Sequence, residues 1–177
     1  MRALVIATFA TLILAGCDTR QHLRAGEPVP GGAHAVALLH SASGVAVGRA
    51  TATEVAGGIR FTVDARALPP GTHGAHVHSV GQCDAPDFTS AGPHWNPTGA
   101  KHGALNPMGP HMGDLPNLII GADGRGTIGV VMPGASMAAL LDADSAAMMV
   151  HAGADDLSTD PGGNSGARIA CGVFVAG

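Results

Sequence analysis

The segment Ile59-Arg60-Phe61-Thr62-Val63-Asp64-Ala65-Arg66 decides the fold class, because apolar and polar residues alternate through it without interruption. Side chains of a β-strand point alternately to its two faces, so this period of two predicts a strand with one buried face. Comparable short runs recur along the chain, separated by glycine-containing turns. We expect them to form strands at residues 35–40, 45–53, 73–79, 118–122, 127–131, 148–151 and 169–176. The pattern therefore predicts an all-β domain of eight strands.

Two long segments have the period of neither a strand nor a helix. Residues 80–115 are dense in glycine, proline and histidine, and residues 152–167 precede the last expected strand. Loops of this length in a compact domain usually have a function. A short run rich in alanine and leucine, 136–141, is the helix candidate, and Asp123-Gly124 is a strong hairpin signal. We predict an eight-stranded Greek-key β-barrel or sandwich with two long functional loops.

The beginning of the chain has the composition of an export signal. Arg2 supplies a positive charge, and the apolar run 3–14 is too short to cross a bilayer. The sequence Leu14-Ala15-Gly16-Cys17 resembles a bacterial lipoprotein signal, although an ordinary secretory signal with a chance cysteine is the alternative. We expect three regions: a signal peptide at 1–16, a lipid anchor on Cys17 with a flexible linker at 17–32, and the folded domain at 33–177.

Such a lipoprotein would reside in the bacterial cell envelope, anchored to a membrane and facing the periplasm. Asp18, directly after the lipidated cysteine, favours the inner membrane in some Gram-negative bacteria. Once Cys17 is set aside, Cys83 and Cys171 remain as an even pair in an oxidising compartment. This favours one disulfide, with two buried thiols as the alternative.

Composition excludes two classes of protein. Charged residues make up 12% of the chain, lysine occurs once, and the net charge is -4. Nucleic-acid binding needs clustered basic residues, so no nucleic-acid partner is expected. A disordered chain would carry more charge and fewer than the 46% hydrophobic residues found here.

The ten histidines are concentrated in one part of the chain, and histidine is a frequent metal ligand. His76 and His78 are two residues apart in an expected strand, so both imidazoles can reach one ion. The loop then adds three imidazoles and one carboxylate, which match a four-coordinate zinc site. These residues are His94, His102, His111 and Asp114. His151, at the end of another expected strand, would by itself be an ordinary histidine.

Six blocks of the sequence resemble, in the same order, those of the Cu/Zn superoxide dismutase family. They are Gly-Thr-His-Gly-Ala-His-Val-His (71–78), Ser-Ala-Gly-Pro-His-Trp-Asn-Pro (90–97), Lys-His-Gly (101–103), His-Met-Gly-Asp-Leu (111–115), Val-His-Ala-Gly-Ala-Asp-Asp (150–156) and Gly-Ala-Arg-Ile-Ala-Cys-Gly-Val (166–173). They are distributed from residue 71 to residue 173 of the expected domain. The resemblance implies the fold of this family, which is a β-sandwich architecture.

The resemblance also implies two metal ions, one copper and one zinc per chain, that share a ligand. The implied copper ligands are His76, His78, His94 and His151. The implied zinc ligands are His94, His102, His111 and Asp114, with His94 bridging the two ions as an imidazolate.

Further residues receive roles from the same resemblance. Arg168 is expected beside the copper, where it would guide an anionic substrate, and Cys83 and Cys171 are expected to form a disulfide. Asp155 would link a copper-ligand histidine to a zinc-ligand histidine. His73 would bind backbone groups and no metal.

The implied reaction is dismutation of superoxide to molecular oxygen and hydrogen peroxide, through alternate reduction and reoxidation of the copper. Superoxide is the expected substrate, His94 and Arg168 are the expected catalytic residues, and a second copy of the chain is a candidate partner. The loop 152–167 departs from the family pattern because it contains no lysine. We therefore expect steering of the anion to depend on Arg168, with help from Lys101, and Asp156 and Asp160 to be solvated acids.

Two other functions remain as alternatives. A non-catalytic periplasmic lipoprotein that binds copper and zinc would need neither a bridging histidine nor Arg168. A zinc hydrolase would need an open zinc position and a general base, but the implied zinc site is closed and the sequence contains no His-Glu-x-x-His motif.

Overall fold

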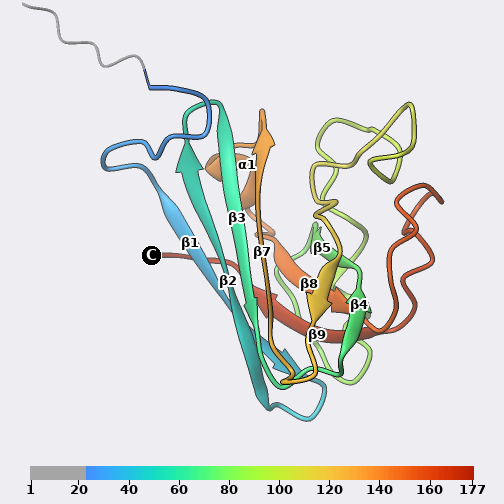
Figure 1. Ribbon diagram of the computed structural model, residues 1–177. Coiled ribbons are helices and arrows are strands. Elements are labelled where there is room, and N and C mark those ends of the chain that lie inside the picture. Colours follow the sequence, from blue (N-terminus) through green and yellow to red (C-terminus); the bar gives the residue numbers. More distant parts are fainter. Residues whose placement is uncertain (1–22) are drawn as a thin grey trace, which may run out of the picture.

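A long antiparallel sheet that curls on itself organises the computed structural model, which describes residues 23–177 (Figure 1). Its order is β5-β8-β9-β1-β2-β3-β7, with β10 paired to β1, and β4 and β6 form a separate pair. The strands are β1 (His34–Ser41), β2 (Ala46–Val55), β3 (Gly58–Ala65), β4 (Gly71–His73), β5 (Ala75–His78), β6 (Leu118–Ile120), β7 (Gly126–Pro133), β8 (Ala147–His151), β9 (Arg168–Val173) and β10 (Val175–Ala176). The all-β prediction is confirmed.

Two of the eight expected strands are each divided, which gives ten. Gly74 separates β4 from β5, and a Cβ there would lie 2.6 Å from the Ser165 hydroxyl. The chain bends at Gly74 because its backbone makes two hydrogen bonds to distant residues. Its N–H donates to the carbonyl of Gly153 in the second long loop, and its carbonyl accepts from the N–H of His151 at the end of β8. Phe174 separates β9 from β10, since its buried ring turns into the core.

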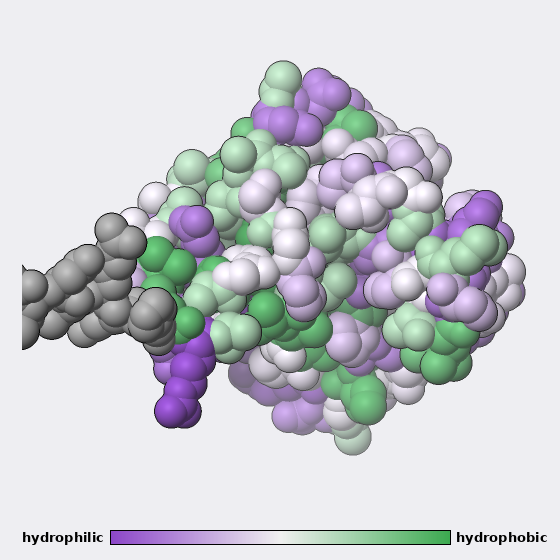
Figure 2. Space-filling view, turned by 90° about the horizontal axis from the view of Figure 1, so that it is seen from above, coloured by the Kyte–Doolittle hydropathy of each residue, from purple (hydrophilic) through white to green (hydrophobic). Residues whose placement is uncertain are grey.

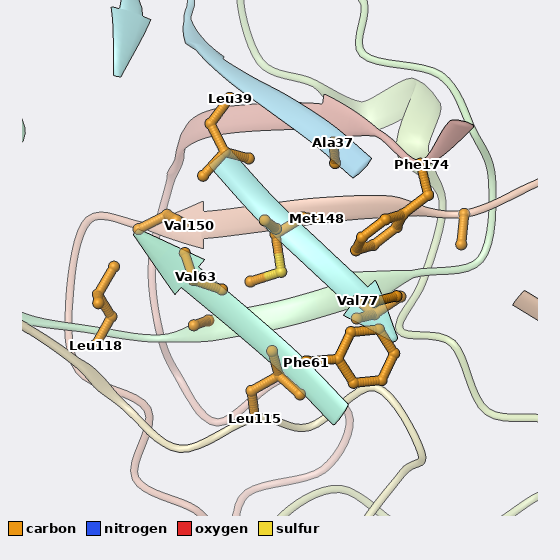
Figure 3. Close-up of a cluster of buried hydrophobic side chains, with 14 of the residues drawn as sticks. Ala37, Leu39, Phe61, Val63, Val77, Leu115, Leu118, Met148, Val150 and Phe174 are labelled. Atoms are coloured by element: carbon orange, nitrogen blue, oxygen red, sulfur yellow. The ribbon is translucent and has the colours of Figure 1, made fainter. Parts of the chain in front are cut away.

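The core fills the space between the two limbs of the curled sheet. In β3, Ile59, Phe61, Val63 and Ala65 are buried, as the alternating pattern predicts. Figure 3 shows Phe61 of β3 facing Val77 and Met148 of the other limb, and the ring centroids of Phe61 and Phe174 are 5.9 Å apart. Burying each such side chain contributes about 1.5–3 kcal/mol, so this contact fixes β5 and β8 against β3.

Both faces of β5 and β8 are buried, which is unusual for an antiparallel sheet. Ala75 and Val77 face the core, so His76 and His78 point to the opposite face of β5. That face is covered by residues 80–117 and 152–167, the two long loops on the right of Figure 1. The loops therefore enclose the histidines against the outside of the sheet.

Short local elements partly match the sequence prediction. Helix α1 (Met137–Leu140) lies within the expected helix, with Ser136 as its N-cap, and η1 (Thr89–Ala91) is a 3-10 turn in the first loop. A turn forms at Asp123-Gly124, but the hairpin expected there is wrong, because β6 pairs with β4 and β7 pairs with β3. The turn redirects the chain between two pairs of strands.

The residues before β1 also contact the sheet. Gly26 donates a backbone hydrogen bond to Ala56, and Pro28 forms an isolated bridge with Val55. Part of the segment expected to be a linker, 17–32, thus packs against the sheet. The expected signal peptide and Cys17 lie outside the described residues. Within residues 23–177, no helix is both long and apolar enough to cross a bilayer.

Candidate metal centre

Seven of the expected ligands lie together in two clusters between the sheet and the loops. One cluster contains His76, His78, His94 and His151, and the other contains His94, His102, His111 and Asp114. In each, the potential ligand atoms lie within 4.8 Å of one another. His94 belongs to both clusters. The structure thus brings together every residue that the resemblance implies as a ligand.

Four buried ring nitrogens in these clusters have no hydrogen-bond partner among the described residues. They are His76 Nδ1, His78 Nε2, His102 Nδ1 and His151 Nε2. A buried polar atom without a partner costs about 1–3 kcal/mol, so four together in one protein need an explanation. Metal ions would satisfy all four lone pairs. The donors present therefore fit a pair of ions.

The second cluster has the donors and spacing of a zinc site. Asp114 Oδ1 lies 2.8 Å from His94 Nδ1, 3.1 Å from His102 Nδ1 and 3.2 Å from His111 Nδ1. Ligand atoms of a tetrahedral zinc ion with bonds of about 2.0–2.1 Å are about 3.3 Å apart. Three nitrogens and one carboxylate oxygen at these separations therefore suit zinc.

The first cluster offers four imidazoles and no carboxylate, a donor set that suits copper. His94 joins the clusters because Nδ1 faces Asp114, which leaves Nε2 on the opposite side of the ring. The His94 and His76 rings have centroids 4.0 Å apart. One side chain is thus positioned to contact two ions.

Asp155 connects the two clusters by contacting one histidine of each. Its Oδ2 lies 2.6 Å from His76 Nε2, and its Oδ1 lies 3.0 Å from His102 Nε2. Both histidines donate through Nε2, so the Nδ1 lone pairs point toward the ions. Asn117 fixes this residue by two backbone contacts of 2.8 Å. The carboxylate thereby sets the tautomer of one histidine in each cluster.

Burial keeps His78 and His151 neutral, the form that binds metal. Desolvation lowers the pKa of His78 to about 2 and that of His151 to about 4. Burial would raise the pKa of Asp114, but hydrogen bonds from His94 and Gly103 outweigh it and lower that pKa to about 2. At neutral pH His78 and His151 are therefore neutral, and Asp114 is ionised.

Arg168 lines a cavity of about 380 Å³ together with His78, His94 and His151. Its guanidinium donates to the Phe88 carbonyl at 2.6 Å and to the Gly92 carbonyl at 2.8 Å. The Gly92 carbonyl also accepts from His78 Nδ1 at 2.8 Å. Because one carbonyl serves both side chains, the cation is held at a fixed position relative to the first cluster.

The first loop is held on the outside of β8 and β9 by a disulfide and a small apolar cluster. Cys83 and Cys171 are joined, as expected, and their Cα atoms are 5.7 Å apart. Phe88 and Ala91 pack against Met149 in the same cluster. These contacts position the Phe88 and Gly92 carbonyls that hold Arg168.

His73 has the structural position that the resemblance implies. Its Nδ1 lies 2.8 Å from the His151 carbonyl, and its Nε2 lies 2.9 Å from the Pro69 carbonyl. Neither nitrogen is directed toward the metal clusters. Through the first contact, His73 supports the backbone at the end of β8.

Asp156 and Asp160 are not merely solvated acids, which corrects the sequence interpretation. Asp156 accepts hydrogen bonds from Ser158, Thr159 and Asn164, so it organises the second loop internally. Asp160 accepts from the His102 backbone at 2.9 Å and pairs with Lys101 at 3.0 Å. It thereby attaches the second loop to His102 of the second cluster.

This ion pair also changes the expected role of Lys101. A lysine paired with a carboxylate that itself lines the cavity adds little net positive potential there. Arg168 is consequently the cation that the cavity presents to an anion, within the described residues.

Two supporting residues were missed at the level of sequence. Asn117 carries no motif, and only its contact with Asp155 reveals its role. Gly163 lies so close to the site that a Cβ would meet Asp155 Oδ1 at 1.8 Å and His102 Nε2 at 2.6 Å. The Asp156-Leu157-Ser158-Thr159 sequence, by contrast, is a recognisable turn signal for the hydrogen bonds of Asp156.

Comparisons with known proteins agree with this geometry. A family model described as copper/zinc superoxide dismutase matches residues 46–174. The Cu-Zn superoxide dismutase of Caulobacter vibrioides is 42% identical over 147 residues, which cover 79% of this chain and 84% of that protein. A solved SOD-like protein from Bacillus subtilis has a TM-score of 0.74 at 41% identity, covering 79% of this chain and 97% of its own. The Cu/Zn superoxide dismutase from Brucella abortus has a TM-score of 0.64 at 36% identity, covering 79% and 98%.

Proposed function

Since the chain belongs to the copper/zinc superoxide dismutase family, it dismutes superoxide with copper and zinc as cofactors, and we propose that the two histidine clusters are where it does so. In this proposal His76, His78, His94 and His151 hold copper. The residues that hold zinc are His94, His102, His111 and Asp114. The observation that carries the proposal is the sharing of His94 between clusters that together contain four buried, unpartnered ring nitrogens.

Bound copper would supply the reversible one-electron chemistry that superoxide dismutation needs, whereas zinc has no accessible redox change. The protein supplies the proton. His94 Nδ1 is directed at Asp114, so Nε2 is the atom that takes up a proton and releases it to the peroxide product. Neutral neighbours favour this transfer, because burial lowers the pKa values of His78 and His151 far below 7.

Arg168 binds and orients the substrate anion. Two of its nitrogens are occupied by the Phe88 and Gly92 carbonyls, and the guanidinium still lines the cavity. A fixed cation that lines a cavity concentrates small anions there and raises their association rate by roughly 10–10³-fold. Arg168 is thus proposed as a catalytic residue together with His94.

The test is metal analysis combined with a direct assay of superoxide decay. The copper- and zinc-loaded chain should contain about one ion of each and remove superoxide faster than the same copper concentration free in solution. His94→Ala should retain copper through three histidines and lose most of the activity. A loaded chain with no activity above free copper would instead indicate a non-catalytic metal-binding protein.

We further propose that the chain is a periplasmic lipoprotein of the bacterial cell envelope, cleaved before Cys17 and anchored at the inner membrane. The lipoprotein-like sequence Leu14-Ala15-Gly16-Cys17, followed by Asp18, supports this location. The disulfide between Cys83 and Cys171 agrees with an oxidising compartment. Mass spectrometry of the native N-terminus tests it, since an unmodified N-terminus would contradict lipidation.

A second copy of the chain is the proposed protein partner. Figure 2 shows hydrophobic residues in separate groups over the viewed face. Exposed apolar side chains available for such a contact include Leu38, Leu105, Met108 and Ile119. Light scattering of the purified domain tests dimerisation, and a monomeric mass at high concentration would contradict it.

A further inference from the structure

A second hollow, of about 370 Å³, lies on the outer face of the sheet, where β2 begins and β3 ends. This is the lower end of both strands in Figure 1. Three arginines line it: Arg49, Arg66 and Arg125. The hollow shares no residue with the cavity that contains Arg168. It is therefore separate from the proposed dismutase site.

The backbone shapes this hollow. Arg49 and Asp64 are direct partners across β2 and β3, and Leu38 is the partner of Arg49 on β1, so all three lie in one row across the sheet. Gly48 lines the same hollow, and a Cβ there would lie 2.4 Å from the Asp64 carbonyl oxygen. The close approach of β2 and β3 thus depends on a glycine.

The three arginines differ from most other cations among residues 23–177 because their guanidinium groups have no partner in that part of the chain. Arg60 donates to the Gly26 carbonyl, Lys101 pairs with Asp160, and Arg168 holds two carbonyls. The guanidinium groups lining the hollow have no hydrogen bond or ion pair to any other residue within 23–177. The acid in the hollow, Asp64, accepts a hydrogen bond from Thr127 at 3.1 Å.

The net positive charge of the side chains lining the hollow favours an anion with more than one negative charge. Three guanidinium groups against one carboxylate leave a local excess of two positive charges, in a chain whose net charge is -4. Arginine presents parallel N–H donors that match the oxygens of phosphate in pairs, and the hollow contains no lysine. A phosphate group has both the charge and the number of acceptors for this arrangement.

We propose that Arg49, Arg66 and Arg125 form a binding site for a phosphate-bearing anion on the outer face of the sheet. This site is independent of the metal clusters. It would attach the protein to phosphate-rich material, either a soluble phosphate compound or the headgroups of an anionic lipid surface.

The experiment titrates inorganic phosphate into the metal-loaded full chain, with its copper reduced, at low ionic strength. NMR follows the backbone amides. Amides at Arg49, Ala65, Arg66 and Arg125 should shift saturably. The triple variant R49Q/R66Q/R125Q should bind at least about tenfold more weakly, as the loss of three partly exposed charge contacts implies. Arg24→Gln, an exposed arginine outside the hollow, is the control and should change the affinity less than twofold, about what a single solvent-screened charge contributes.

A vesicle arm distinguishes the two sources of phosphate. Stronger binding of the full chain than of the triple variant to phosphatidylglycerol vesicles, with no difference on phosphatidylcholine, identifies a lipid headgroup. Equal vesicle binding with phosphate binding retained identifies a soluble compound. Shifts restricted to residues around Arg168, or equal phosphate affinity of wild type and triple variant, would overturn the proposal while leaving the dismutase function intact.

Discussion

Replacing Asp155 with asparagine should weaken copper binding more than zinc binding, although Asp155 contacts a histidine of each cluster. The reason is the backbone N–H of Leu157, which donates to Asp155 Oδ1 at 2.6 Å. An amide must keep its oxygen there to accept this bond. Its NH2 group then occupies the Oδ2 position and faces His76 Nε2, where two donors would meet.

The mismatch at His76 has a calculable consequence. His76 can avoid two opposed donors only by moving its proton to Nδ1, the atom that is free for copper. Loss of such a supporting partner typically weakens metal binding 10–100-fold, or about 1.4–2.7 kcal/mol. His102 keeps an oxygen acceptor at Oδ1, so zinc affinity should fall by less than tenfold, below the range for a lost partner.

Competition titrations of copper and zinc against chelators of known affinity measure both constants. Asp156→Asn is the matched control, because Asp156 organises the same loop and contacts no histidine. A similar loss of copper affinity in both variants would attribute the effect to loop disorder. A larger loss of zinc than of copper would refute the orientation argued from Leu157.

Three further results are expected. Arg168→Ala should lower kcat/KM for superoxide roughly tenfold or more and flatten the dependence of kcat/KM on ionic strength. Superoxide decay at several salt concentrations measures both effects, and an unchanged salt dependence would exclude steering by this residue. Cys171→Ser should lower the free energy of unfolding by about 4–5 kcal/mol, because the disulfide closes a loop with a sequence separation of 88. Urea unfolding of the metal-free protein measures this change, and a loss under about 1 kcal/mol would show that loop closure contributes little. The metal-free protein should also lose stability as pH falls below 6.5, since the pKa values of His78 and His151 are lowered to about 2 and about 4 in the folded state, so the unfolded chain binds more protons. At pH 5 the metal-free protein should have lost about 2 kcal/mol of stability for each of these histidines relative to pH 7, whereas the metal-loaded protein should keep its stability. Equal pH profiles of stability with and without metal would contradict this explanation.

The strands could be predicted because their signal is local. The alternation from Ile59 to Ala65 depends only on the two faces of one strand, and the structure buries those residues as expected. The break at Gly74 could not be predicted, because it arises from backbone pairing with Gly153 in a distant loop. The hairpin at Asp123-Gly124 was wrong for a related reason, since strand partners are chosen by the whole sheet.

The metal clusters divide in the same way. His76 and His78 could be paired from strand geometry, and the loop residues from their donor types. His151 is a single histidine on an apolar strand, so only the family resemblance placed it with them before the structure did. The attachments made by Asn117 and Asp160 join segments far apart in the sequence, and no local pattern encodes them.

Anomalous X-ray scattering at the copper and zinc absorption edges of the metal-loaded crystal tests the central claim most directly. Two separate peaks are predicted, with copper among His76, His78 and His151, zinc among His102, His111 and Asp114, and the His94 ring between them. A single metal peak, two peaks without His94 between them, or both metals bound elsewhere would contradict the account.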